Sequence, residues 1–174
     1  DTPQSTEQRT YLAAIDKSAR ALLALIDEIL DFSKIEAGKM ELVHAPFDVR
    51  NCVMGAIELL APRAREKGLD LKWSFAPDLT ETFSGDEFRV RQIVLNLVSN
   101  AVKFTALKER AEIEVGCLTD RSPTVYFIKD NGVGFNMKYY SRLFGVFERL
   151  HRREEFDGTG IGLAIVQKIV QRHG

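Results

Sequence analysis

The stretch RQIVLNLVSNAVKFT, residues 91–105, decides the fold, because it places two asparagines in an otherwise apolar helix. Asn96 and Asn100 are four residues apart, so both carboxamides lie on one face of a helix that we expect over Asp86–Phe104, together with Lys103. Asparagine oxygens are hard, neutral ligands that suit a Mg²⁺ ion already held by nucleotide phosphates. A cap or a buried hydrogen-bond network is the alternative role for this pair.

A glycine-bearing segment, DNGVGF, follows at residues 130–135. Its acidic residue, Asp130, comes directly after an apolar strand, and Gly132 and Gly134 let the backbone approach a ligand. A carboxylate in that place can accept a hydrogen bond from an exocyclic amine such as that of adenine. A plain Asp-Asn-Gly turn explains the same residues without a ligand.

A second glycine-bearing segment, GTGIGL at residues 158–163, leads into a helix that we expect over Ile161–His173. Glycine-rich backbone before a helix N-terminus suits an anion such as phosphate, and it equally suits a simple helix cap. The G-x-G-x-G spacing differs from the G-x-G-x-x-G dinucleotide motif, and the sequence contains no G-x-x-x-x-G-K-[ST] P-loop.

The rest of the chain after residue 42 alternates helices and strands. Helical periodicity covers Val49–Lys67. Apolar alternation predicts strands over Leu69–Phe75, Ala111–Leu118 and Thr124–Lys129, with a hairpin turn at residues 119–123 between the last two. Mixed helices and antiparallel strands predict an α+β fold, a two-layer sandwich with the helices on one face of the sheet.

The first forty residues form a separate unit. A capping box of Ser5 and Gln8 and a stop at Gly38 predict one helix of about 30 residues. Its apolar positions follow a 3-4 spacing with a second stripe: Leu12, Ile15, Ala19, Leu22, Ile26 and Ile29, then Leu23, Leu30 and Ala37. This heptad pattern predicts a coiled coil or four-helix bundle that joins two copies of the chain, and the alternative is a core helix packed on its own domain.

Composition narrows the possible partners. With 24 Lys+Arg against 25 Asp+Glu, the net charge is −1, which argues against a nucleic-acid partner. No apolar run has the length of a transmembrane helix, so we expect no membrane contact in this segment. Cys52 and Cys117 lie far apart without metal-ligand spacing, which predicts two buried thiols in a reducing, cytoplasmic setting.

In this order, the segments resemble the sequence boxes of sensor histidine kinases of two-component systems, in the wider ATPase group that includes gyrase B, MutL and the heat-shock chaperone of that fold. The boxes are RQIVLNLVSNAVKFT, DNGVGF, LFGVFERL (residues 143–150) and GTGIGLAIV (residues 158–166). The segment LLALIDEILDFSKIEAGKMEL, residues 22–42, is similar to the second helix of the family's dimerisation stalk. Residues 143–164 are especially similar to soluble phytochrome-like and hybrid sensor kinases.

The resemblance implies a Bergerat ATP-binding fold over residues 43–174, which we expect to lack its usual C-terminal strands, after a partial histidine-phosphotransfer stalk over residues 1–42. It implies ATP and Mg²⁺ as cofactors, transfer of the γ-phosphoryl group to a stalk histidine, and relay to a receiver-domain aspartate of a response regulator. The resemblance is compatible with either a soluble or a membrane-anchored whole protein. The alternative function is a nucleotide-binding interaction module without catalysis.

Carried over residue by residue, the resemblance makes Asn100 the Mg²⁺ ligand, with Asn96 and Lys103 beside the phosphates. Asp130 would bind the adenine amine, and Arg149 would approach the terminal phosphate. Gly132 and Gly134 would shape the adenine pocket. Further residues would flank the triphosphate: Gly158, Thr159, Gly160, Gly162 and Leu163. A mobile lid would cover Tyr139–Asp157, anchored at one edge by Phe144, Phe147 and Leu150.

Two features depart from the pattern of a complete kinase or a hydrolysing ATPase. His44, His151 and His173 lack the acidic and proline neighbours of the family's phosphoacceptor, so we expect no autophosphorylation in cis and surface roles for the last two. Asn96 stands where hydrolysing relatives have a Glu that activates water. An amide cannot act as that base, so we expect slow ATP hydrolysis.

Overall fold

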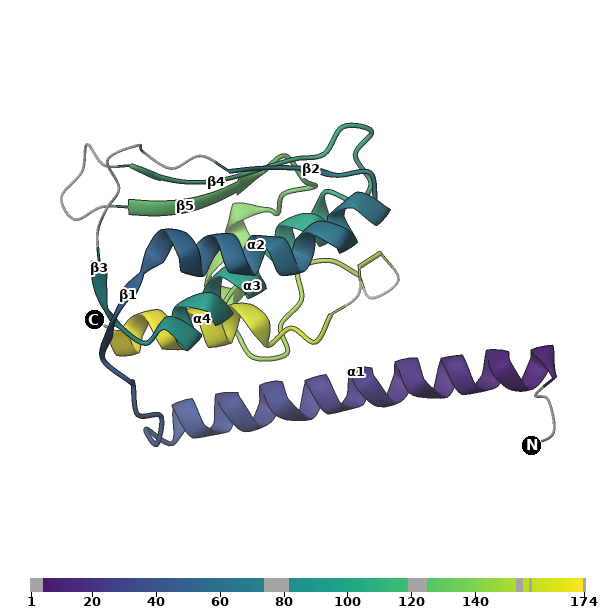
Figure 1. Cartoon of the computed structure of the whole chain (residues 1–174), viewed down its shortest axis with the longest axis horizontal. Helices are drawn as coiled ribbons and strands as arrows, with labels where there is room; N and C mark the ends of the chain where they lie inside the picture. The colour runs from purple at the N-terminus through teal and green to yellow at the C-terminus, as the bar shows by residue number, and fades with distance from the viewer. Residues whose placement is uncertain (1–4, 74–81, 119–124, 153–154, 157, 174) are drawn as a thin grey trace.

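The computed structural model describes residues 5–73, 82–118, 125–152, 155–156 and 158–173. Its elements follow in chain order: α1 (Thr6–Glu36), β1 (Ala45–Asp48), α2 (Val49–Glu66), β2 (Asp70–Trp73), β3 (Thr82–Gly85), α3 (Glu87–Phe104), β4 (Glu112–Leu118), β5 (Val125–Asp130), the 3₁₀ helix η1 (Met137–Arg142) and α4 (Gly162–His173). Figure 1 shows β2, β4 and β5 as one layer, with α2, α3 and α4 on one face of it. The predicted α+β, two-layer class is confirmed.

The main sheet has the order β2-β4-β5. Strand β4 is antiparallel to β5, as predicted, but β2 and β4 are parallel, so the expectation of antiparallel strands throughout was wrong. The reason is that the chain between β2 and β4 crosses the sheet through α3, and such a crossover returns the chain in the same direction. The hairpin turn predicted at residues 119–123 lies outside the described residues.

A second, smaller sheet was missed. Strands β1 and β3 pair antiparallel, from Ala45 opposite Gly85 to Asp48 opposite Thr82. Each strand has only four residues, and Pro46 interrupts the apolar alternation that would have indicated the first one. This sheet brings Asp48 and Asp86 to the starts of α2 and α3, where each side chain accepts a hydrogen bond from a backbone N–H and caps its helix.

The main core lies between the sheet and two helices. Buried apolar side chains come from α2, α3 and β4: Val53, Ile57, Val98, Val102, Ile113 and Val115. Helix α3 therefore gives one face to this core, which leaves its other face free to line a site. Cys52 is buried as predicted, whereas Cys117 is half-buried, because it lies near the end of β4 where the core thins.

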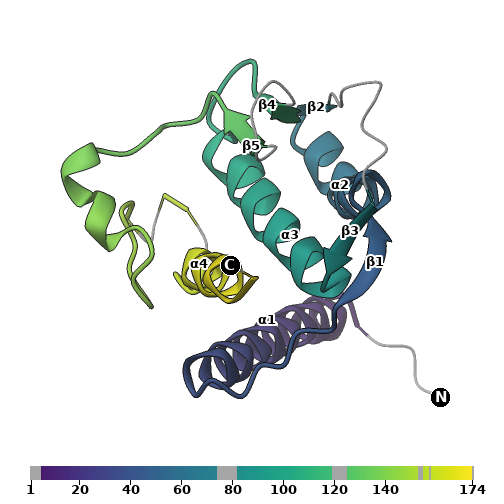
Figure 2. The same cartoon turned by 90° about the vertical axis from the view of Figure 1, so that its left-hand side faces the viewer.

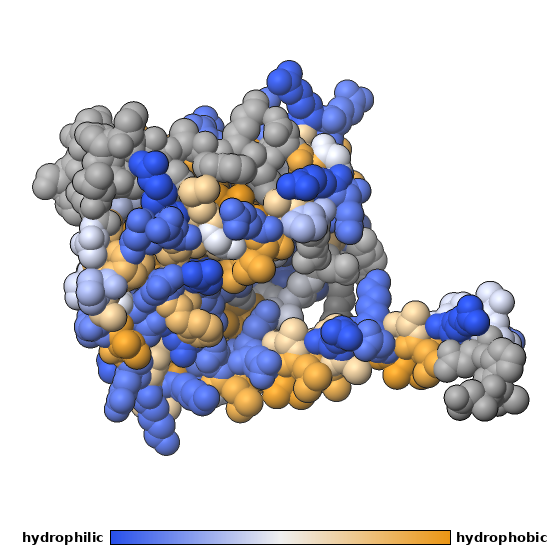
Figure 3. All heavy atoms as spheres, viewed as in Figure 1, coloured by the Kyte–Doolittle hydropathy of each residue, from blue (hydrophilic) through white to orange (hydrophobic). Residues whose placement is uncertain are grey.

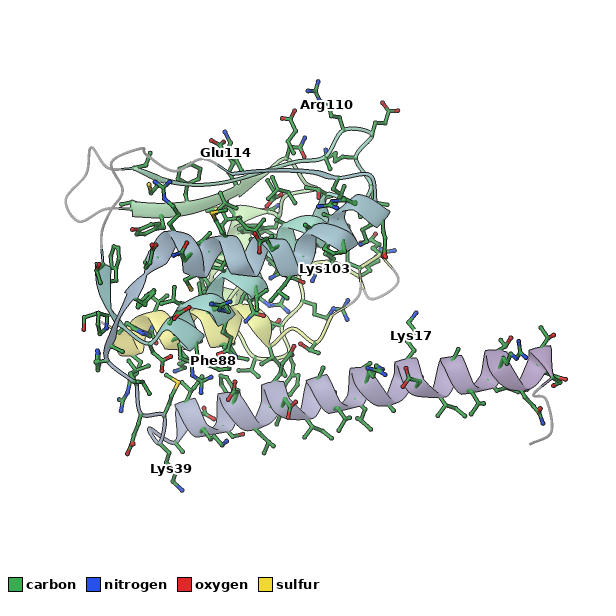
Figure 4. All side chains as sticks on the ribbon, in the orientation of Figure 1. Lys17, Lys39, Phe88, Lys103, Arg110 and Glu114 are labelled. Carbon is green, nitrogen blue, oxygen red and sulfur yellow. The ribbon has the colours of Figure 1, made fainter. Side chains whose placement is uncertain are left out.

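Helix α1 begins with the predicted capping box, in which Gln8 N donates to Ser5 Oγ at 3.2 Å and Ser5 N donates to Gln8 Oε1 at 2.9 Å. Its heptad side chains remain exposed, for example Leu12 at 48% and Ile15 at 63%. Figure 3 shows this apolar seam along the side of α1 that faces away from the domain, and Figure 4 shows Lys17 on the opposite side.

The C-terminal part of α1 packs on the domain. Ile35 is buried in a second apolar cluster with Met40, with Ile161 just before α4, and with Ile165 and Ile169 of α4. Figure 2 shows α1 lying beneath α3 and α4. The alternative of a core helix packed on its own domain therefore holds for this C-terminal part, and pairing of the exposed part with a second copy stays a prediction. No helix in the described part of the chain combines the length and apolarity needed to cross a membrane.

Candidate functional site

A cavity of about 860 Å³ lies between α3, the end of β5, the segment after η1 and the start of α4. Eleven of the twelve site residues expected from the sequence line it: Asn96, Asn100, Lys103, Asp130, Gly134, Arg149, Gly158, Thr159, Gly160, Gly162 and Leu163. Gly132 is the exception. Three motifs that are far apart in the sequence thus line one cavity.

The wall formed by α3 meets the first turn of α4. A β-carbon on Gly162 would lie 2.9 Å from Asn96 Oδ1, a separation that Cβ atoms essentially never show. Any larger residue at position 162 would require the Asn96 side chain or α4 to shift. The N-terminus of α4, with its unpaired N–H groups and positive dipole end, therefore lies directly beside the asparagine pair.

The loop before α4 has backbone that favours glycine. Gly158 has φ 144° and Gly160 has φ 77°, both in regions that L side chains rarely adopt. A β-carbon on Gly160 would lie 2.9 Å from the Glu148 carbonyl oxygen, and one on Gly158 would lie 3.2 Å from Lys103 Nζ. The loop thus exposes bare backbone beside a lysine ammonium group, which is an arrangement suited to phosphate.

Asp130 is fixed at the other end of the cavity. Its Oδ1 accepts a hydrogen bond from Gly132 N at 2.9 Å. A β-carbon on Gly132 would lie 2.6 Å from that same oxygen and 2.8 Å from the Phe104 carbonyl oxygen. Gly132 therefore shapes the site from behind, because it lets the Asp130 carboxylate sit against the end of α3.

Asn131 supports this site from outside the cavity wall, a role that the sequence analysis missed. Its Oδ1 accepts a hydrogen bond from Glu112 N at 2.9 Å, and its Nδ2 donates to the Arg110 carbonyl oxygen at 2.9 Å. These two bonds tie the loop after β5 to the start of β4, next to Asp130. The sequence offers one indication of this role, the place of Asn131 in the Asp-Asn-Gly run, but a plain turn explains that run equally well.

Arg149 lines the cavity, and its guanidinium group donates hydrogen bonds to nearby backbone carbonyl groups. Its Nη1 donates to the Gly158 carbonyl oxygen at 2.9 Å, and its Nη2 donates to the Phe156 carbonyl oxygen. Within the predicted lid, Phe144 and Leu150 are half-buried, as anchors should be. Phe147 is 62% exposed and has φ 60°, so its expected anchoring role was wrong, because this backbone turns its ring outward.

An aromatic cluster forms part of the wall. The rings of Phe104, His151 and Phe156 have centroids 5.1–5.3 Å apart, and Lys103 Nζ lies 4.3 Å from the Phe104 centroid. The surface role expected for His151 was wrong, since its tilted and edge-on contacts with two phenylalanines leave it half-buried. His173 is also half-buried, with Nδ1 2.9 Å from the Ile169 carbonyl oxygen.

The stalk helix contributes a carboxylate to the cavity. Glu28 lines it, and Thr159 Oγ1 donates to Glu28 Oε2 at 2.6 Å across 131 positions of sequence. One turn later, Asp31 Oδ2 accepts bonds from Arg89 Nη1 and Gln92 Nε2, both at 2.9 Å. No local pattern indicates these contacts, because Glu28 and Asp31 look like ordinary polar residues of one helix and their partners lie far away in the sequence.

The described residues contain no cluster of three or more His, Cys, Asp or Glu side chains that could hold a metal ion. The polar donors in the cavity include instead the amides of Asn96 and Asn100, backbone N–H groups, and the cations Lys67, Lys103 and Arg149. Such a set fits a Mg²⁺ ion that keeps most of its ligands from phosphate and water, with Asn100 as a protein ligand. It does not fit a metal ion held by protein side chains alone.

Two family models match the chain. The model described as "Histidine kinase-, DNA gyrase B-, and HSP90-like ATPase" matches residues 85–174, and "His Kinase A (phospho-acceptor) domain" matches residues 1–38. The first covers more than half of the chain and includes α3, β5 and α4. The second covers α1.

Curated relatives and solved structures agree with these models. The chain is 38% identical to the signal transduction histidine-protein kinase BarA of Escherichia coli and to the sensor protein GacS of Pseudomonas syringae, over 99% and 96% of its own length. It spans 19% of the length of each. The crystal structure of full-length ShkA in complex with AMPPNP matches 98% of this chain and 35% of that one, with a TM-score of 0.82 and 32% identity.

Proposed function

The chain belongs to the sensor histidine kinases, within the histidine kinase-, DNA gyrase B- and HSP90-like ATPase family, and on that premise we propose that it carries the ATP-binding and phosphoryl-transfer part of a two-component sensor. The observation that carries this proposal is the single cavity lined by Asn100 of α3, Asp130 after β5 and the glycine loop before α4. A site for adenine at one end and phosphate at the other needs these three elements together.

The binding roles follow from what each group can donate or accept. The Asp130 carboxylate accepts a hydrogen bond from the adenine amine, held in place by Gly132 and Asn131. At the other end, the backbone at Gly158 and Gly160 and the N-terminus of α4 face the phosphates. A bound Mg²⁺ supplies charge neutralisation of the phosphates, with Asn100 as its protein ligand and Asn96 and Lys103 alongside.

The reaction that we propose is transfer of the γ-phosphoryl group to a histidine of the stalk, followed by relay to a receiver-domain aspartate. Positioning and electrostatic stabilisation account for most catalysis of phosphoryl transfer, so the chain's groups act by holding the phosphates. No histidine in this chain lies in an acceptor motif, and the acceptor is therefore supplied by a longer chain or in trans. Asn96 provides no base for water, so hydrolysis is slow beside transfer.

The partners are proposals of the same kind. The exposed heptad seam of α1 is suited to a helical bundle with a second copy of the chain, as in a stalk homodimer. A response-regulator receiver domain is the second protein partner. We place the reaction in the cytoplasm, because ATP is its substrate.

The first test is calorimetric titration with ADP and with an unhydrolysable ATP analogue, with and without Mg²⁺. We expect Mg²⁺-enhanced binding that Asp130→Asn weakens at least about tenfold, because the amide replaces an ionised acceptor. Glu114→Gln is the matched control, since Glu114 lies on β4 in the exposed face of the sheet, away from the cavity (Figure 4). A folded protein without nucleotide affinity would overturn the proposal.

A second test separates a kinase from an interaction module that only binds nucleotide. A stalk domain that contains an acceptor histidine is incubated with the chain and ATP labelled at the γ-position. Acid-labile label on the stalk supports the kinase. Clear nucleotide binding without any labelled histidine favours the interaction module.

A further inference from the structure

The contact between Thr159 and Glu28 occupies the phosphate end of the cavity. Thr159 lies in the glycine loop, between the two residues whose backbone faces the predicted phosphates, and Glu28 lies on the stalk helix α1. The hydroxyl donates to Glu28 Oε2 at 2.6 Å and accepts from Ile161 N at 3.3 Å, at the start of α4. A carboxylate is thus bonded where the helix N-terminus favours an anion.

This contact takes the one proton that the hydroxyl can donate. A threonine hydroxyl has a single O–H, so while it bonds Glu28 it cannot also donate to a phosphate oxygen. In addition, the Glu28 carboxylate places a negative charge in the cavity that must also hold the negatively charged phosphates. Both effects oppose an anion at this end of the cavity and leave the Asp130 end unaffected.

Glu28 is held in place by a packed interface. At the next turn of α1, Asp31 pairs with Arg89 of α3, with side chains 27% and 15% exposed, and Asp31 also binds Gln92. Another turn on, Ile35 is buried in one cluster with Ile161, just before α4, and Ile165 of α4. These three positions share one face of α1, so the helix presents Glu28 to the glycine loop in a fixed register.

We infer that Glu28 is a specificity-determining residue of the nucleotide site, and that its carboxylate opposes binding of a nucleoside triphosphate more than that of a diphosphate. The inference rests on the proposed function, since it requires this cavity to be the nucleotide site. The terminal phosphate adds both charge and length at the end where Glu28 lies. Linkage then requires that the triphosphate weaken the docking of α1 by the same factor.

The test compares affinities for the unhydrolysable ATP analogue and for ADP, both with Mg²⁺, in the wild-type chain and in Glu28→Gln. The amide keeps the shape of the side chain and removes its charge. We expect the analogue to bind about fivefold tighter and ADP to change less than about twofold, at the lower end of coupling between sites. A merely structural role would move both affinities together.

Two further variants make the result decisive. Glu28→Ala removes the carboxylate and releases the Thr159 hydroxyl, so it is expected to tighten analogue binding at least as much. Asp27→Asn removes a neighbouring charge from an exposed position of α1 that does not line the cavity, and it is expected to leave both affinities unchanged.

The possible failures can be told apart. If the wild-type chain binds both nucleotides and the Glu28 variants match Asp27→Asn, the inference is overturned and the proposed function stands. Weaker Mg²⁺-dependent binding in both Glu28 variants also overturns it, because Glu28 would then assist the metal. A wild-type chain that binds neither nucleotide overturns the proposed function and the inference with it.

Discussion

Gly162, the first residue of α4, lies so close to Asn96 of α3 that a β-carbon on the glycine would be 2.9 Å from the amide oxygen. This approach sets how near the α4 N-terminus comes to the asparagine pair. A methyl group at position 162 would therefore displace the Asn96 amide or α4 at the phosphate end of the cavity.

The variant Gly162→Ala should weaken binding of the ATP analogue by about tenfold, because α4 or Asn96 must shift to relieve the overlap. Calorimetric titration measures this loss. Gly55→Ala is the control, since the β-carbon there would meet only the flexible tip of Arg91, at 2.9 Å. Equal affinity in Gly162→Ala and the wild type would show that the close approach is not needed for binding.

Asn131→Ala should weaken nucleotide binding although Asn131 is absent from the cavity wall. The variant loses two hydrogen bonds that hold the strand end carrying Asp130, each worth about 1 kcal/mol. We expect both the ATP analogue and ADP to bind several-fold more weakly, because adenine is common to both. A variant with lower thermal stability and unchanged affinities would make the role of Asn131 purely structural.

Asp31 and Arg89 should be energetically coupled. Their ion pair is mostly shielded from solvent, and it joins α1 to α3. A double-mutant cycle of Asp31→Asn and Arg89→Gln, followed by denaturant unfolding, should give a coupling energy of about 1 kcal/mol. The same cycle on the exposed pair Asp16 and Arg20 should give less, because solvent screens it. Equal values for the two pairs would contradict the shielding argument.

The two cysteines should differ in reactivity. Burial raises the pKa of the Cys52 thiol, an effect that the nearby Arg91 charge only partly offsets. A raised pKa leaves less thiolate at any alkaline pH, and thiolate is the reactive form. At about pH 8.5, the ordinary pKa of a free thiol, we expect iodoacetamide to modify half-buried Cys117 well before Cys52. Peptide mass spectrometry after short exposure measures both rates, and faster modification of Cys52 would refute this.

Local periodicity was enough to predict the larger helices. The bounds of α2, α3 and α4 agree with the expected ranges to within one residue, because caps such as Asp86 and positive-φ glycines such as Gly68 mark helix ends in the sequence itself. Strands were harder. The β1 and β3 strands are too short to show alternation, and the parallel pairing of β2 with β4 depends on a crossover that no window of sequence contains.

The candidate site divides in the same way. Its glycines and asparagines were visible as motifs because backbone requirements fix them locally, as the positive φ of Gly134 and Gly160 illustrates. Contacts that cross the fold were invisible. Glu28 meets Thr159 from another helix, and His151 is half-buried only because Phe104 and Phe156 happen to converge on it.

Among the described residues, the contacts of helix α1 with the domain lie toward its C-terminal end, so the helix can act as a lever. The 22 residue steps from Glu28 back to Thr6 extend roughly 33 Å at 1.5 Å per residue. Over that length, a tilt of α1 by about 5° around its docked end would move its N-terminal end by about 3 Å. Conversely, a displacement of a few ångströms at the N-terminal end of α1 would produce a much smaller shift, with greater force, at the docked end. That shift would act on the hydrogen bond between Glu28 and Thr159.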